Sequence, residues 1–149
     1  MGPNEIVEYA AEVLWWTCLG GVSYASILLG VSLPQHFGKR INSQEELEKI
    51  VAEEAPKLGL DPSNIHSSYG IDKYGNGISC YSVKLAHGYG LHIGHPFFAT
   101  RGVIRHELYH IADGHCDNMV VRSKFKNLLA YLLNDEPKAI IYGSFKLKL

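Results

Sequence analysis

The stretch TRGVIRHELYHIADG, residues 100–114, is where the fold of this chain can be predicted most directly. Thr100 is a good N-cap residue, and Gly114 stands where a left-handed C-cap residue belongs, so we expect a helix from about 100 to 113. On a helical wheel the apolar side chains fall on one side, opposite two histidines and a glutamate. The stretch therefore predicts a helix with one buried face and one face that carries chemistry.

The polar face of this helix holds the motif His106-Glu107-Leu108-Tyr109-His110, which is H-E-x-x-H. Histidines at i and i+4 lie one turn apart and can direct two imidazoles at one tetrahedral zinc ion. The chain has eight histidines, yet the complete motif would arise by chance only about 0.03 times at this composition. We therefore predict a Zn²⁺ site formed by His106 and His110, with Glu107 as the general base.

A catalytic zinc ion usually has three protein ligands, so one more is needed. A third histidine at the metzincin spacing would fall at Cys116, and the glycine of that pattern would fall at Asp113, so the pattern fails. Glu136 is the strongest candidate, because a later helix running antiparallel could bring its carboxylate to the site. His115 is the runner-up and Asp117 is weaker. Asp113 or Asp117 could instead accept the second N–H of a ligating histidine.

Upstream of the motif, Ser43 to Leu58 has a helical pattern with a capping box formed by Ser43 and Glu46, and Gly59 is a natural stop. Three short β-rich runs follow, at roughly 64–70, 77–85 and 89–94, and Gly75-Asn76-Gly77 is a strong hairpin signal. We expect these runs to form a small antiparallel sheet of three strands.

Downstream of the motif, a helix is expected from about Asn118 to Leu133, and Pro137 lies near the start of a last short helix. This order of elements predicts an α+β domain with helices on one face of the sheet.

The bulk composition is that of a folded domain: 149 residues, 46% apolar, 19% charged, with a net charge of −1. Since no segment collects Lys and Arg, we expect no nucleic-acid partner. The three cysteines are far apart and odd in number, which predicts neither a disulfide framework nor a cysteine zinc site. A reducing, cytoplasmic environment is the expectation.

The first forty residues differ in character from residues 41–149. Residues 13–33 form a run of 21 residues without a charge, long enough to cross a bilayer as a helix. Two alternatives remain open: Gly20-Gly21 divides the run into two short core helices, or an amphipathic helix packs on the globular body. If the run spans a membrane, Lys39 and Arg40 place residues 41–149 in the cytoplasm.

The H-E-x-x-H motif followed by Glu136-Pro137-Lys138-Ala139 resembles the gluzincin zinc peptidases, and the compact size of residues 41–149 resembles the archaeal minigluzincins. These are minimal catalytic scaffolds related to integral-membrane metallopeptidases. The resemblance implies hydrolysis of peptide bonds in a peptide or protein substrate. The rival interpretation is a non-catalytic binding module that zinc only stabilises.

Three further expectations concern the mechanism. The oxyanion needs a donor besides zinc. A substrate strand would pair with a sheet edge at Tyr89 to Gly94. The alternating residues Ser144 to Leu149 suit an edge strand or a tail lying in the cleft, which would make the enzyme latent. Candidates for the oxyanion donor are Tyr109, His115, Tyr142 and His92.

Overall fold

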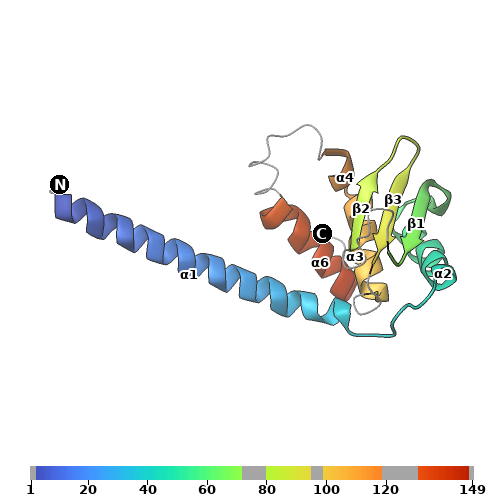
Figure 1. Cartoon of the computed structure of the whole chain (residues 1–149), viewed down its shortest axis with the longest axis horizontal. Coiled ribbons are helices and arrows are strands. Elements are labelled where there is room, and N and C mark those ends of the chain that lie inside the picture. Colours follow the sequence, from blue (N-terminus) through green and yellow to red (C-terminus); the bar gives the residue numbers. More distant parts are fainter. Residues whose placement is uncertain (1–2, 72–79, 95–98, 119–130, 148–149) are drawn as a thin grey trace. The chain divides into compact units, whose positions relative to one another are not determined.

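The computed structural model describes residues 3–71, 80–94, 99–118 and 131–147 (Figure 1). The chain divides into two compact units, Met1–Val31 and Ser32–Leu149. The second unit holds a three-stranded sheet and the helices that pack against it. It is an α+β arrangement, as the sequence predicts.

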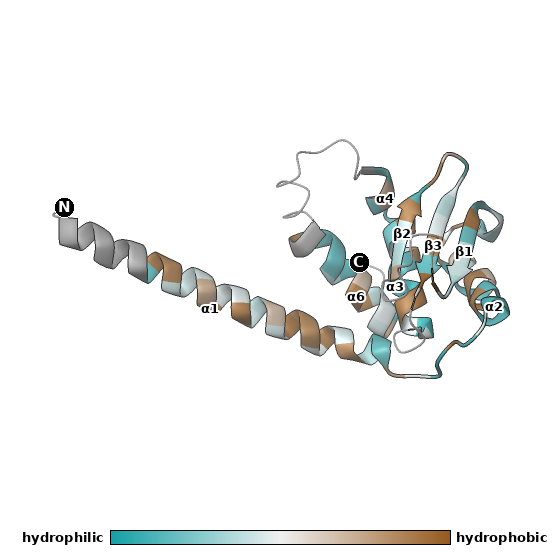
Figure 2. Cartoon of the chain, viewed as in Figure 1, coloured by the Kyte–Doolittle hydropathy of each residue, from teal (hydrophilic) through white to brown (hydrophobic). Residues whose placement is uncertain are grey.

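Helix α1, Pro3–His36, contains all the described residues of the first unit. It continues through Gly20 and Gly21 without a break, since a glycine within a helix costs only about 1 kcal/mol. The division into two short core helices is therefore wrong. Glu12–His36 is long and apolar enough to cross a membrane by length and composition, and its most apolar window contains no buried residue. Figure 2 shows apolar residues along much of this stretch.

Helix α2, Gln44–Glu54, continues into a 3₁₀ turn, Ala55–Leu58. The Ser43 hydroxyl accepts a hydrogen bond from the Glu46 amide at 3.2 Å, and the Glu46 carboxylate accepts one from the Asn42 amide at 3.0 Å. Gly59 ends the segment with a φ of 78°, a left-handed conformation that favours glycine. The predicted helix, its capping and its stop are confirmed.

The sheet consists of β1, Ile65–Tyr69, β2, Cys80–Lys84, and β3, Tyr89–Ile93, in the order β1-β3-β2. Strands β2 and β3 are antiparallel, but β1 and β3 are parallel. The prediction of a purely antiparallel sheet is therefore wrong. Because β3 lies between β1 and β2, it is not an edge strand. The prediction that a substrate strand pairs with an edge at Tyr89 to Gly94 is therefore wrong as well.

The sheet order explains why the hairpin signal led to a wrong prediction of strand pairing. A tight turn joins β2 to β3, where the Leu85 amide donates to the Gly88 carbonyl at 3.1 Å and Gly88 has a φ of 97°. Gly75-Asn76-Gly77 lies outside the described residues, and it connects two strands that are not neighbours. A turn motif favours a reversal of the chain, but it does not decide which strand the next one pairs with.

Helix α3, Arg101–Ala112, carries the H-E-x-x-H motif and packs against β2 and β3. The Thr100 hydroxyl accepts from the Val103 amide at 3.3 Å, and Gly114 has a φ of 71°. Both predicted ends are thus confirmed. The apolar side of α3 contributes to one core with residues of α2, β1 and β3. Its fully buried members include Leu47, Leu91, Ile93, Ile104, Leu108 and Tyr109.

Among the described residues, α3 is followed by α4, His115–Asn118, a π-helical turn, Tyr131–Asp135, and α6, Glu136–Phe145. Most of the helix expected over 118–133 falls outside the described residues. Pro137 lies in the first turn of α6, as predicted. Ser144 and Phe145 belong to α6 and not to a strand. The edge strand predicted over Ser144 to Leu149 is therefore wrong at these two residues.

Helices α3 and α6 run antiparallel and very close, because Gly143 of α6 lies where they meet. An ideal Cβ on Gly143 would lie 2.8 Å from the Gly102 carbonyl oxygen and 3.0 Å from the His106 Cβ. A side chain at Gly143 would push the helices apart. This close approach brings the start of α6, where Glu136 lies, next to the histidines of α3.

Candidate metal centre

Three side chains from α3 and α6 bring their donor atoms together at one point. The Nε2 atoms of His106 and His110 are 3.2 Å apart. The Glu136 carboxylate places one oxygen 3.5 Å from His106 Nε2 and the other 3.3 Å from His110 Nε2. Both imidazoles are buried, and Glu136 is largely buried. This group could hold a metal ion.

The separations between the donor atoms are of the size that a zinc site needs. Zinc binds imidazole nitrogen and carboxylate oxygen at about 2.0–2.2 Å, so its ligand atoms lie about 3.3–3.6 Å from one another in a tetrahedron. The two Nε2 atoms are 3.2 Å apart, and the N···O separations of 3.3 and 3.5 Å belong to different oxygens of the Glu136 carboxylate, which lies across both rings. Two nitrogens and one oxygen also suit zinc, which accepts both kinds of donor. The residues present therefore fit the ion that the sequence predicts.

Electrostatics at the group favour positive charge. Burial by itself lowers the pKa of His106, but the hydrogen bond that its ring donates to Glu136 and the charges of Glu107 and Glu136 outweigh this effect, so the pKa is raised. The carboxylates thus stabilise a cation at the place where the three donors meet.

Glu107 lies one residue after His106 and is buried beside the group. Burial raises the pKa of this carboxyl, and the charge of Glu136 adds to the effect, while His106, His110 and a hydrogen bond from Ser82 oppose it. A carboxylate with a raised pKa accepts protons more readily, as a general base must.

Glu107 and His110 line a small cavity of about 90 Å³ together with residues of β2 and α4. This volume holds several water molecules. The remaining lining residues are Cys80, Tyr81, Ser82, His115 and Cys116. A water molecule therefore has room next to both the His110 imidazole and the Glu107 carboxylate.

The structure places the two other ligand candidates away from the donor atoms. His115 lies behind His110, with the two Nδ1 atoms 2.8 Å apart, so it faces the side of that ring opposite to Nε2. The Asp117 carboxylate forms an ion pair with Lys84 at 3.1 Å and accepts from the Tyr89 hydroxyl at 3.2 Å. Of the three candidates that sequence reasoning proposed, Glu136 alone joins His106 and His110 in the group.

The candidate oxyanion donors are scattered. His92 pairs with Tyr81 across the strands and hydrogen-bonds to Ser68 at 2.9 Å, on the face of the sheet opposite to Ser82. Tyr109 and Tyr142 are buried and contact each other, with ring centroids 5.3 Å apart.

Sequence reasoning missed Ser82, which contacts both Glu107 and Cys116. Ser82 lies in a five-residue strand whose alternation shows which residues share a face, but not which helix that face meets. The three cysteines, Cys18, Cys80 and Cys116, are free thiols, as expected.

No family model, no curated protein and no solved structure matches this chain. Its function must therefore be argued from the geometry of the group itself.

Proposed function

We propose that the chain is a zinc metallopeptidase of gluzincin type, with His106, His110 and Glu136 as zinc ligands and Glu107 as the general base. The observation that carries the proposal is the convergence of two imidazole Nε2 atoms, 3.2 Å apart, with the Glu136 carboxylate, whose oxygens lie 3.3 Å from one and 3.5 Å from the other. The position of Glu107 beside the same group is what distinguishes a hydrolytic site from a site that only stabilises a fold.

When bound, zinc would act as a Lewis acid and lower the pKa of a coordinated water. Glu107 would take the proton of the attacking water on its carboxylate and later deliver it to the leaving amine. The Ser82 hydroxyl, which hydrogen-bonds to Glu107, would hold that carboxylate toward the cavity. The Glu136 carboxylate reaches both imidazoles, one with each oxygen, so it would complete the ligand set with the two histidines.

The substrate would be a peptide or protein that adds a strand beside the cavity. Among the described strands, β2 pairs with β3 on one side and forms an outer strand of the sheet. Its residues Cys80, Tyr81 and Ser82 line the cavity next to Glu107. A substrate in extended conformation along β2 would pass the base and the metal group together.

We also propose that the segment Glu12–His36 of α1 anchors the enzyme in a membrane, with residues 41–149 in the cytoplasm. The length and composition of the helix support the anchor. Lys39 and Arg40 follow it directly, which favours the cytoplasmic orientation. Recovery of the full-length chain in the soluble fraction without detergent would overturn this proposal.

The test of the catalytic proposal is the substitution Glu107→Gln in the full-length protein. We expect the variant to bind zinc as the wild type does, because Glu107 is not a ligand, and to cleave a casein-type substrate about 10²–10⁴-fold more slowly. The matched control is Glu48→Gln, a glutamate exposed on α2, which should leave the rate unchanged. Equal cleavage by wild type and Glu107→Gln, with zinc bound in both, would favour the non-catalytic module.

A further inference from the structure

The two ligand histidines differ in what lies behind their rings. The Nδ1 atom of His106 is buried and has no hydrogen-bond partner among the residues that the structure describes. The Nδ1 atom of His110 faces the Nδ1 atom of His115 at 2.8 Å. On its other side His115 Nε2 lies 2.9 Å from the Asp113 carboxylate and 3.3 Å from the Asp135 carboxylate. His110 is therefore the first member of a chain of polar groups.

The direction of the hydrogen bonds in this chain follows from the role of His110. A neutral imidazole that offers the lone pair of Nε2 to a metal carries its proton on Nδ1. The Nδ1–H of His110 must then donate to His115 Nδ1, which accepts through its own lone pair. The proton of His115 is left on Nε2, where it donates to the carboxylates of Asp113 and Asp135. The opposite direction would place a proton on His110 Nε2 and block the ligand.

This row of polar groups, from His110 through His115 to the two aspartates, also connects α3 with α6. Asp113 is the C-cap of α3, His115 begins α4, and Asp135 directly precedes Glu136 at the start of α6. Lys138 of α6 lies 3.8 Å from the same Asp113 oxygen that contacts His115. A change at His115 would thus affect the orientation of His110 and the anchorage of the segment before Glu136.

We propose that His115 is a positioning residue that fixes the tautomer of His110 and ties it to the segment carrying Glu136. The proposal rests on the metal site proposed above, although it does not depend on peptide hydrolysis. Partners of this kind behind a ligating histidine typically account for about 10–100-fold in metal affinity.

The first test compares two isosteric variants with a full removal, in the full-length protein. Asn at position 115 keeps an acceptor near the place of Nδ1, whereas Gln keeps a donor near the place of Nε2. We expect His115→Leu to weaken zinc binding about 10–100-fold in a chelator competition. We expect His115→Asn to recover most of the loss and His115→Gln less of it. The control is His66→Leu, on the exposed side of β1, which should bind zinc normally.

The second test uses the wild type, so it does not depend on whether a variant folds. Long-range ¹H–¹⁵N spectra of the zinc-loaded protein should show His110 with its proton on Nδ1 and His115 with its proton on Nε2. A ¹⁵N shift at His115 that indicates metal coordination would make it a ligand and overturn the proposal. Zinc binding of wild-type strength in His115→Leu would overturn it too.

The outcomes separate this proposal from the proposed function. Wild-type protein that binds zinc but cleaves nothing leaves the positioning role standing and removes the peptidase. An active wild type with an unaffected His115→Leu variant removes the positioning role alone. Wild-type protein that does not bind zinc overturns both.

Discussion

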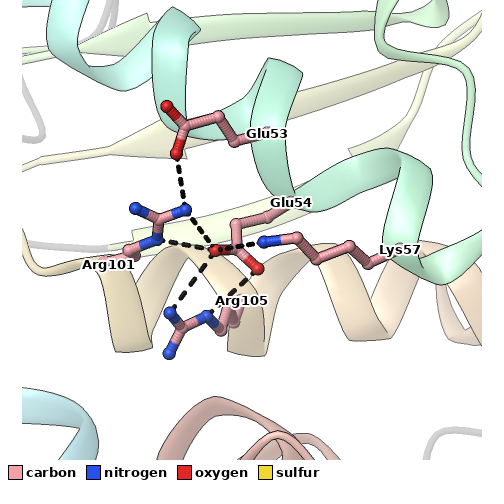
Figure 3. Close-up of polar contacts among 5 residues, drawn as sticks. All are labelled: Glu53, Glu54, Lys57, Arg101 and Arg105. Carbon is pink, nitrogen blue, oxygen red and sulfur yellow. Dashed lines mark hydrogen bonds and ion pairs between the residues drawn. The ribbon is translucent and has the colours of Figure 1, made fainter.

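Two carboxylates contact helix α3 from neighbouring elements, and their surroundings differ in kind. Glu54, the last residue of α2, is only 1% exposed and contacts Arg101, Arg105 and Lys57, as Figure 3 shows. Glu136, the first residue of α6, contacts the Nε2 atoms of two imidazoles. In the first cluster the protein itself supplies the cations. In the second it supplies groups that can offer lone pairs to a cation from outside.

The source of the compensating cation distinguishes the Glu54 cluster, which is structural, from the candidate metal centre. Burial alone would raise the pKa of Glu54, but hydrogen bonds from its three cationic neighbours lower it to about 2. Arg105 Nε lies 3.2 Å from one Glu54 oxygen, and Lys57 Nζ lies 3.0 Å from the other. The protein therefore supplies the cations that compensate Glu54, so this cluster should need no cation from solution. The histidine group should gain its full stability only with a metal.

Substitution of Glu54 should destabilise the protein more than any other change proposed here, because it removes the anion of the Glu54 cluster. Glu54→Gln should lower the free energy of unfolding by about 3–5 kcal/mol, because the largely buried Arg105 loses the charge that compensates its burial. Urea denaturation at neutral pH measures the loss, with Glu48→Gln as the matched control on an exposed part of the same helix. The folded variant should still bind zinc like the wild type. A loss below about 1 kcal/mol would class Glu54 with exposed ion pairs.

The pH dependence of stability tests the same cluster without removing a contact. Glu54 has a pKa of about 2 in the folded chain and an ordinary value of 4.5. Its contribution is therefore fully present above about pH 5 and is lost as the pH falls toward 2, a change of about 3 kcal/mol. Denaturation curves from pH 6 to pH 2 should show this additional loss in the wild type relative to Glu54→Gln. Parallel pH profiles for the two proteins would contradict it.

Metal addition tests the other cluster. Zinc at 100 times its dissociation constant should raise the free energy of unfolding of the wild type by about 2.7 kcal/mol. Glu136→Ala should lose most of this increase at the same zinc concentration, because one of the three donors is gone. Glu54→Gln should keep it. Thermal or urea unfolding with and without zinc measures all three, and an equal increase in Glu136→Ala would remove Glu136 from the ligand set.

Helix α3 and the two histidines of the candidate metal centre could be predicted from sequence because the relevant signals are local. Thr100, Gly114 and the spacing of His106 and His110 all act within one helix. Glu136 required one further step, the antiparallel return of a later helix. That step succeeded because Pro137 marks the start of α6 and because Gly143 allows α6 to pack closely on α3.

The sheet order and the Glu54 cluster could not be predicted in the same way. Pairing of β1 with β3 brings together residues more than twenty positions apart, and five-residue strands carry no signal for their neighbour. Glu54 and Arg101 are 47 positions apart, and each looks like an ordinary surface charge in the sequence. Burial of a charge is decided by tertiary packing, so only the structure shows that Glu54 is compensated.

The cations of the Glu54 cluster differ in how far they are exposed to solvent. Lys57 is 53% exposed, whereas Arg105 is 13% exposed, although both form ion pairs with Glu54. Water solvates the Lys57 ammonium in the unfolded and folded chain alike, so Lys57→Ala should cost less than about 1 kcal/mol. Arg105→Ala should cost more, because it removes a buried partner and leaves part of the Glu54 charge uncompensated. Urea denaturation of the two variants side by side measures the difference. If Lys57→Ala lowered the free energy of unfolding as much as Arg105→Ala, the exposure of the cation would not determine the strength of its ion pair with Glu54. Burial would then no longer explain why Glu54 is compensated by cations of the protein itself, whereas Glu136 is left to contact a cation from solution.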